Sequence, residues 1–231
     1  MQASNVMLMT TIHSPARRLM RSMRTLLITG VAGLVAFLVL GNLVIFSATL
    51  WAKEAAAEPA YLELAGVPNG VRVDAHLWRG AAPTDQGYRS LAAGGVETIV
   101  DLRAEEDIVV NEALLDRLGV RLVRIPMRDG QAPTPREVDR FLAVVKRSDG
   151  KVFVHCGAGV GRTGAMVGSY LVDKGVEPMD ALQKNLSIGP PSLEQITFVA
   201  ALSPDDVESP APLMTALSRV LDAPRRILTR F

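Results

Sequence analysis

The sequence predicts an α/β protein with a central, mostly parallel sheet flanked by helices, preceded by one N-terminal transmembrane helix. Three features carry this prediction. Between residues 71 and 202, short apolar runs typical of buried strands alternate with segments of helical periodicity, and this alternation is typical of a parallel sheet covered on both faces. A glycine-rich loop joins one such strand, at 151–155, to a helix. Residues 26–51 contain no charged side chain. An uncharged segment of this length is long enough to cross a bilayer as a helix.

Local signals predict the individual strands and helices. Apolar runs bounded by turn residues predict strands, which are expected at residues 77–83, 96–103, 120–126 and 151–155. Thr84 provides a helix N-cap, and Thr134 with Glu137 forms a capping box around a proline at the first helical position. Helices are expected at residues 84–94, 105–118, 134–147, 165–172, 178–186 and 192–202.

The chain is expected to divide into five segments. These are a basic cytoplasmic N-terminus at 1–25, a transmembrane helix or signal anchor at 26–51, a tether at 52–70, the globular domain at 71–202, and a linker with a basic C-terminal tail at 203–231. The tail mixes leucines with arginines, and we expect it to form a terminal helix that packs on the domain or frays in solvent. A segment lying on a lipid surface is the alternative.

Composition excludes several function classes. The formal net charge of +1 lacks the strong basic excess of a nucleic-acid-binding protein. Cys156 is the only cysteine among 231 residues, so no intramolecular disulfide can form. The three histidines are widely scattered, and no cluster of His, Asp and Glu has metal-ligand spacing. We therefore expect neither a metal ion nor another cofactor.

The flanks of the apolar segment predict its orientation. Four arginines precede it within residues 17–24, whereas only Lys53 follows it closely. By the positive-inside rule, the N-terminus stays in the cytoplasm and the domain lies on the extracytoplasmic side, periplasmic or extracellular. We favour an uncleaved anchor. Small residues near its C-terminal end would also suit a signal peptidase, and translation from Met20 or Met23 is a further alternative.

The loop after the strand at 151–155 has the composition of an anion site. Its glycines let backbone N–H groups turn inward around an anion, and the following helix adds the positive end of its dipole. Arg162 supplies a planar guanidinium group that can donate hydrogen bonds to two phosphate oxygens at once. Cys156 lies in this positive field, which favours the nucleophilic thiolate. The expected phosphate-binding residues are Gly157, Ala158, Gly159, Val160, Gly161 and Arg162.

The pattern His155-Cys156, five residues, then Arg162-Thr163 resembles the signature loop of the cysteine-dependent protein tyrosine phosphatase superfamily. The residue sequence of the loop is most similar to that of the tyrosine and dual-specificity phosphatases, and the stretch 77–102 also resembles bacterial dual-specificity enzymes. The resemblance covers residues 71–202. It implies the phosphatase (CX5R) fold and hydrolysis of phosphate monoesters through a cysteinyl-phosphate, without a metal.

The resemblance also implies roles for residues outside the loop. An aspartate on a mobile loop upstream of the cysteine serves as general acid, and Asp129, which begins a glycine- and proline-bearing loop, is our choice. A loop aspartate capping a turn is the alternative role, with Asp101 and Asp107 as rival acids. Thr163 supplies a hydroxyl to the cysteine sulfur. His155 orients the loop, and Gln195 lies where some relatives place a water-positioning glutamine.

Several substrate classes remain open. The loop interior, 157–161, lacks the lysines of phosphoinositide phosphatases, which disfavours a polyphosphorylated inositol. We expect phosphotyrosine, with phosphoserine and phosphothreonine as further substrates in a phosphorylated protein or small phosphoester. The membrane segment keeps a phospholipid phosphatase as an alternative. A non-catalytic phosphate-binding module and a sulfurtransferase are hypotheses from other classes.

Overall fold

The computed structural model describes residues 15–56, 59–105, 109–203 and 206–228. The chain forms two compact units, Met1–Gly41 and Asn42–Phe231. A single helix, α1 (Pro15–Ala55), begins in the first unit and ends in the second. Because so much of the chain is described, most of the predicted elements can be compared directly with the structure.

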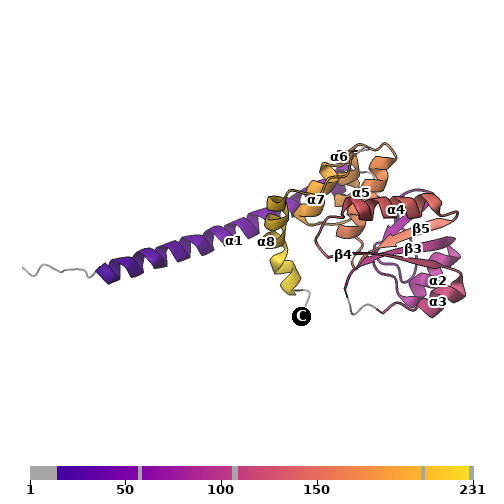
Figure 1. The fold of residues 1–231 in the computed structure, drawn as a ribbon, viewed down its shortest axis with the longest axis horizontal. Coiled ribbons are helices and arrows are strands. Elements are labelled where there is room, and N and C mark those ends of the chain that lie inside the picture. Colours follow the sequence, from indigo (N-terminus) through magenta and orange to yellow (C-terminus); the bar gives the residue numbers. More distant parts are fainter. Residues whose placement is uncertain (1–14, 57–58, 106–108, 204–205, 229–231) are drawn as a thin grey trace, which may run out of the picture. The chain divides into compact units, whose positions relative to one another are not determined.

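The second unit is built on a five-stranded sheet with the strand order β1-β2-β5-β3-β4 (Figure 1). Its strands are β1 (Val71–Arg72), β2 (Leu77–Gly80), β3 (Val96–Arg103), β4 (Arg121–Met127) and β5 (Lys151–His155). Only β1 runs antiparallel to its neighbour; β2, β5, β3 and β4 pair in parallel. The mostly parallel sheet is therefore confirmed. In its centre, His155 is in register with Gly80 on one side and with Asp101 on the other.

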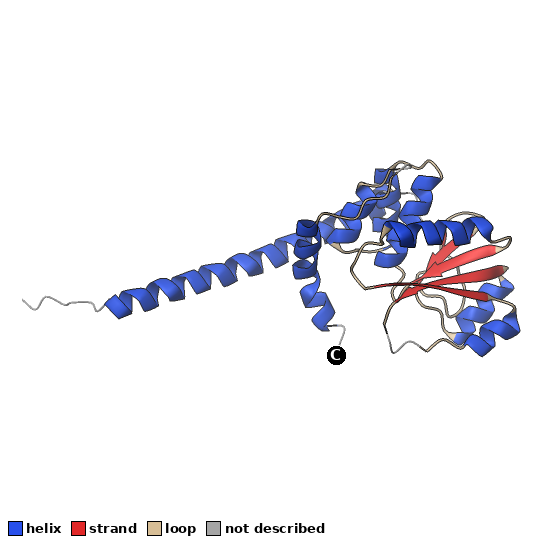
Figure 2. Cartoon of the chain, viewed as in Figure 1, coloured by secondary structure: helices blue, strands red, loops and turns tan. Residues whose placement is uncertain are grey.

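Helices cover both faces of this sheet (Figure 2). The helices that follow α1 are α2 (Asp85–Ala93), α3 (Glu112–Leu118), α4 (Pro135–Arg147), α5 (Gly161–Asp173), α6 (Pro178–Ile188), α7 (Leu193–Ala200) and α8 (Pro212–Leu228). The larger core cluster joins the sheet to α4, α5, α6 and α7 and contains the buried Phe141, Met166 and Phe198. The smaller cluster, around Phe153 and Leu91, joins the opposite face to α2 and α3. Burial of these apolar side chains is the main stabilising contribution to the domain.

Side-chain caps fix where the helices begin. Thr84 accepts a hydrogen bond from the backbone of α2, and Thr134 with Glu137 forms the predicted capping box of α4. The prediction of a helix over 105–118 is wrong at its start. Asn111 caps α3, which begins only at Glu112, and Glu105 instead contacts an arginine of another element.

The C-terminal part of α1, from Asn42, belongs to the second unit and packs on its other elements. Ile45, Thr49 and Ala52 are buried, and Asn42 donates a hydrogen bond through Nδ2 to the Leu221 carbonyl of α8 at 3.3 Å. Helix α8 also contacts α7. Within the expected tether, 52–70, the first residues continue α1 and Tyr61 forms a β-bridge with Val71.

The part of α1 in the first unit has a different surface. Its apolar side chains between residues 19 and 41 are almost all exposed to solvent. Length and composition make Leu19–Ala55 a helix able to cross a membrane. A helix of this kind near an N-terminus is a membrane span or a signal sequence.

Candidate active site

The cysteine lies where the parallel strands converge. Cys156 directly follows β5, and α5 begins five residues later at Gly161. Because β2, β5 and β3 run parallel, their carboxyl ends meet at this edge of the sheet, the usual ligand site of open α/β sheets. The side chain of Cys156 is buried and still lines a cavity.

Donors outside the loop hold its carbonyl groups. Four successive carbonyl oxygens each accept a hydrogen bond from another segment of the chain. The pairs are Gly157 with the Ala82 backbone N–H at 3.1 Å, Ala158 with Asn69 Nδ2 at 3.0 Å, and Gly159 and Val160 with Arg79 Nη2 at 2.9 and 3.3 Å. In a planar trans peptide the N–H points opposite to the C=O. The N–H groups that follow these carbonyls therefore face the interior of the loop, as an anion site requires.

Arg79 is the main support of the loop. Its side chain is 2% exposed, and Nη1 donates to Asn185 Oδ1 at 2.6 Å. Burial lowers the pKa of Arg79 to about 10. The negative charge of the Cys156 thiolate acts in the opposite direction and raises this pKa. The guanidinium therefore remains charged near neutral pH and places a positive charge behind the cysteine.

Two glycines of the loop lie in close approaches, and Gly159 is required by its backbone conformation. Gly159 has φ +73°, and a Cβ there would collide with the backbone of Gly80. A Cβ on Gly161 would collide with the side-chain oxygen of Gln195. The loop is thus fitted against β2 on one side and against α7 on the other.

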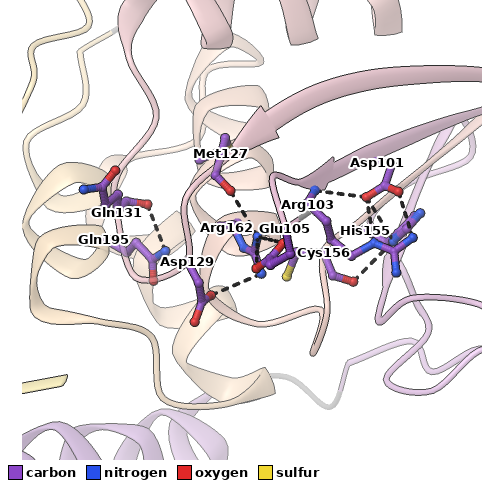
Figure 3. Close-up of polar contacts among 10 residues, drawn as sticks. All are labelled: Asp101, Arg103, Glu105, Met127, Asp129, Gln131, His155, Cys156, Arg162 and Gln195. Carbon is purple, nitrogen blue, oxygen red and sulfur yellow. Dashed lines mark hydrogen bonds and ion pairs between the residues drawn. The ribbon is translucent and has the colours of Figure 1, made fainter. Parts of the chain in front are cut away.

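Arg162 joins the loop to two carboxylates from other segments (Figure 3). Its Nη1 lies 2.9 Å from Glu105 Oε1 and donates to the Met127 carbonyl at 3.1 Å, and its Nη2 lies 3.3 Å from Asp129 Oδ1. Burial alone would lower the pKa of Arg162, but the hydrogen bond that Arg162 donates to Glu105 and the charges of Cys156 and Asp129 raise it above its ordinary value. The same bond holds the pKa of Glu105 below its ordinary value, against the effect of burial.

Asp129 follows β4 and lies at the same cavity as Cys156. The cavity has a volume of about 350 Å³. Its lining residues are Asp129, Gly130, Cys156, Ala158, Val160, Gly161, Pro190, Pro191, Ser192, Gln195 and Asp222. The side chain of Asp129 is 67% exposed while that of Arg162 is 4% exposed. The structure thus brings together the predicted Cys156, Arg162 and Asp129.

His155 lies below the loop as a neutral residue. Its Nδ1 is 3.2 Å from the Cys156 carbonyl, and burial lowers the pKa of His155 to about 4, although the charge of Asp101 acts in the opposite direction. Asp101 is engaged elsewhere, with both carboxylate oxygens on Arg103 at 2.9 and 2.8 Å. This bidentate pair, which lowers the pKa of Asp101 despite its burial, supports the structural role expected for this rival acid. Asp107, the other rival, lies outside the described residues.

Two further predicted residues have mixed outcomes. Thr163 is buried in the first turn of α5, but its hydroxyl makes no hydrogen bond to the Cys156 sulfur or to any other described residue. Gln195 lines the cavity, and its Nε2 donates to the Gln131 carbonyl at 3.0 Å. It therefore contacts the loop that carries Asp129.

Several buried polar atoms without a hydrogen-bond partner lie around the anion loop, residues 156–162. Within the described part of the chain, Nε of Arg79 and of Arg162, Nε2 of His155 and the Thr163 hydroxyl are buried without a hydrogen bond. Such atoms are uncommon in folded proteins and call for an explanation, such as a bound ligand or a reacting group. Among the described residues no cluster of His, Cys, Asp and Glu is arranged to hold a metal ion. The arrangement is suited to a nucleophile, an anion hole and a proton donor.

Sequence reasoning missed two residues of this site. Arg79 is the one charged residue of the buried strand β2. Its place in this short apolar run could have indicated a functional residue, because a charge is seldom buried without a partner or a function. Glu105 was assigned to a helix, and nothing in its local pattern points toward Arg162, 57 residues later.

Comparison with known proteins agrees with this geometry. A family model described as "PTP-NADK: DSP-PTPase phosphatase fused to NAD+ Kinase" matches residues 66–201, more than half of the chain. The chloroplastic NAD kinase 2 of Arabidopsis thaliana is 37% identical over 100 residues, which cover 41% of this chain and 10% of that protein. The chain therefore spans only about a tenth of the length of this curated relative.

Solved structures share the fold. TpbA of P. aeruginosa has a TM-score of 0.51 at 21% identity, covering 72% of this chain and 98% of TpbA. The core catalytic domain of the PP-IP phosphatase SIW14 of S. cerevisiae has a TM-score of 0.55 at 17% identity, covering 63% and 91%. At these identities the likeness concerns the fold alone. The family match, together with the fold and the Cys156–Arg162 loop, establishes that the chain belongs to the DSP-PTPase phosphatases described as fused to NAD+ kinase and is an enzyme of the cysteine-dependent phosphatase superfamily.

Proposed function

We propose that this enzyme hydrolyses phosphate monoesters through a cysteinyl-phosphate intermediate, with Cys156 as nucleophile, Arg162 and the N–H groups of 157–161 as the phosphate site, and Asp129 as general acid. The observation that carries the proposal is the shared cavity of Cys156 and Asp129, with Nη2 of Arg162 3.3 Å from the Asp129 carboxylate. Glu105 and Met127 contact Nη1 of Arg162. The edge of the guanidinium formed by Nε and Nη2 is therefore the one that would donate hydrogen bonds to the phosphate.

In the first step the sulfur of Cys156 attacks phosphorus. The S–P bond forms, the P–O bond to the leaving group breaks, and the Asp129 carboxyl gives its proton to the departing oxygen. The equatorial phosphate oxygens are stabilised by the loop N–H groups and by Arg162, donors that are already in place before the reaction. In the second step water attacks phosphorus, the S–P bond breaks, and the Asp129 carboxylate takes a proton from the water. Inorganic phosphate and the Cys156 thiolate are the products.

The hydroxyl of Thr163 has a place in the second step. It is buried in the first turn of α5 without a partner among the described residues, so it is available to donate to the sulfur as the thiolate leaves. This contact would stabilise the leaving thiolate without taking part in the first attack.

Phosphotyrosine is the substrate class we favour, with phosphoserine and phosphothreonine as further substrates. TpbA, which shares the fold, has been solved in complex with pTyr, with a TM-score of 0.50 at 22% identity. The cavity wall also contains Pro190, Pro191 and Val160, whose apolar surfaces suit an aromatic ring. A membrane phospholipid with a terminal phosphate is the alternative, favoured by the apolar surface of α1.

The test is the hydrolysis of an aryl phosphate by the full chain in detergent with EDTA present. Wild-type enzyme should turn over, Cys156→Ser should be inactive, and Asp129→Ala should be slower by about a hundredfold or more. Turnover that survives in Cys156→Ser would overturn the proposal. A panel of phosphopeptides and phosphatidic-acid vesicles then decides between protein and lipid substrates.

We also propose that α1 anchors the enzyme, with its catalytic domain outside the cytoplasm. The exposed apolar portion before Asn42 would cross the membrane, because the portion after it is partly buried on the domain. The arginines within residues 17–24 favour a cytoplasmic N-terminus. A reporter enzyme that works only outside the cytoplasm should be active when fused after Phe231, and a reporter that works only in the cytoplasm should be inactive there. The reverse result would refute this orientation.

A further inference from the structure

The N-terminus of α7 holds the loop that carries the proposed general acid. Three hydrogen bonds join it to the three residues after Asp129. They run from Ser192 Oγ to the Gly130 carbonyl at 2.8 Å, from Gln195 Nε2 to the Gln131 carbonyl at 3.0 Å, and from the Ala132 N–H to Glu194 Oε1 at 3.1 Å. The backbone beside Asp129 is thus fixed by side chains of a neighbouring helix, as Figure 3 shows for Gln195 and Gln131.

Glu194 is the unusual member of this group. It is 5% exposed, yet its second oxygen, Oε2, has no hydrogen-bond partner among the described residues. Burying a carboxyl group that makes a single side-chain hydrogen bond is costly. Packing alone would be served better by an apolar side chain, so the cost indicates a function for the bond to Ala132.

Helix α8 in turn fixes Glu194. The backbone N–H of Glu194 donates to Ser218 Oγ at 3.0 Å, and Ser218 is fully buried. One turn later, Asp222 of the same helix lines the cavity that contains Cys156. Helix α8 lies outside the residues matched by the phosphatase family model, 66–201. Helix α8 therefore contributes to the cavity on the side of the acid loop, residues 129–132, from outside the matched segment.

We propose that Glu194 and Ser218 are positioning residues for the general acid, and that α8 is a working part of the catalytic unit. Ser218 holds the N-terminus of α7, Glu194 holds the Ala132 N–H, and this bond keeps Asp129 at the phosphate site. The inference rests on the proposed function, because it assigns Asp129 the proton transfer. It also links the acid loop to α1, since the Leu221 carbonyl of α8 accepts the hydrogen bond from Asn42.

Leaving-group dependence separates a positioning role from a merely structural one. A misplaced acid slows the loss of a basic phenoxide, which needs the proton, but has little effect on a nitro-substituted phenoxide, which leaves without it. A general weakening of the fold slows both esters equally. The two substrates are phenyl phosphate and p-nitrophenyl phosphate, measured with the full chain in detergent.

Four variants are compared with wild type. Glu194→Ala should lower kcat for phenyl phosphate by roughly ten- to a hundredfold, with much less effect on the nitrophenyl ester and on KM. Glu194→Gln keeps an acceptor for Ala132 and should restore most of the loss. Ser218→Ala should show the same pattern more weakly. Arg219→Ala, at the exposed neighbouring position of α8, is the matched control and should behave as wild type.

Equal losses for both esters in Glu194→Ala and Ser218→Ala, or no loss at all, would overturn the inference. Amide hydrogen exchange supplies a readout that does not depend on turnover. The amides at 130–132 should exchange faster in both variants than in Arg219→Ala, and unchanged exchange would contradict the positioning role. If wild-type enzyme itself shows no Cys156-dependent turnover, the proposed function fails, while the exchange result still decides whether α8 fixes this loop.

Discussion

The anion loop and the acid loop of this enzyme are built in opposite ways. The anion loop is held in place, because its four carbonyls at 157–160 accept hydrogen bonds from other segments. The acid loop begins with Asp129, whose side chain is 67% exposed. Glu105, on a third loop, is likewise 48% exposed. Arg162 is the point where the fixed and the exposed regions meet.

This difference matches the demands of the proposed chemistry. Charge on the phosphate oxygens must be met by dipoles that do not reorganise, so an anion hole gains from being fixed. A proton donor must admit the substrate and then approach the leaving oxygen, so it gains from an exposed loop. Substitutions in the two regions should therefore have different effects on turnover and on stability.

Arg162→Lys tests the fixed region and should have the largest effect. Lysine keeps the positive charge but loses the planar fork that contacts both the phosphate and Glu105. We expect kcat to fall by about a hundred- to a thousandfold with every aryl phosphate, whatever its leaving group. Inhibition by vanadate, a phosphate analogue, should weaken in parallel. A loss confined to substrates with basic leaving groups would assign Arg162 to proton transfer instead.

The exposed region is tested by comparing two carboxylates on the same arginine. Asp129→Asn should lower kcat by about a hundredfold for phenyl phosphate and much less for p-nitrophenyl phosphate. Glu105→Gln removes a carboxylate that lies even closer to Arg162 and should reduce both rates by similar, smaller factors, because the Met127 carbonyl still holds Arg162. Thermal melting of both variants should stay near wild type, since the two side chains are 48% and 67% exposed. A steeper leaving-group dependence for Glu105→Gln would exchange the two roles.

Arg79→Leu tests the support behind the loop. The substitution leaves the Gly159 carbonyl and the side chain of Asn185 without their buried donor. We expect a loss of about 1–3 kcal/mol in the free energy of unfolding and weaker inhibition by vanadate. Arg72→Leu, an exposed neighbour on β1, is the control. Full stability and unchanged inhibition in Arg79→Leu would show that the loop holds its shape without this arginine.

The pH dependence of stability should report the burial of His155. Burial lowers its pKa to about 4 in the folded chain, whereas a histidine of the unfolded chain titrates near 6.5. As the pH falls through this window the unfolded chain binds a proton that the folded chain does not. The free energy of unfolding should thus fall by about 1.4 kcal/mol per pH unit. His155→Gln should flatten this slope between about pH 6.5 and 5, and an identical slope in the variant would contradict a buried, neutral His155.

Local signals were sufficient for most of the fold. The capping box at Thr134 and Glu137 and the N-cap at Thr84 involve residues a few positions apart, so the sequence displays them directly. The start of α3 was predicted too early, because Asn111 caps this helix and Glu105 contacts Arg162. The packing of Ile45, Thr49 and Ala52 on the domain could not be predicted either, since an apolar helix face looks the same against lipid or protein.

The predicted site shows the same limit. Cys156 and Arg162 lie within one loop, so their spacing predicts their proximity. Asp129 required the family resemblance, because only the fold brings the end of β4 to the same edge of the sheet as the end of β5, with β3 between them. Arg79 and Glu194 act through contacts 80 and 62 residues away along the chain, with Gly159 and Ala132. No local pattern encodes such distances.

The central claim is that Cys156 carries the phosphoryl group during turnover. The most direct measurement is mass spectrometry of the full chain, quenched in acid during steady-state hydrolysis of an aryl phosphate. We predict a phosphoryl adduct on the peptide that contains Cys156, increased in Asp129→Asn, where the second step lacks its base, and absent from Cys156→Ser. An actively hydrolysing enzyme without this adduct, or with the phosphoryl group on another residue, would contradict the account.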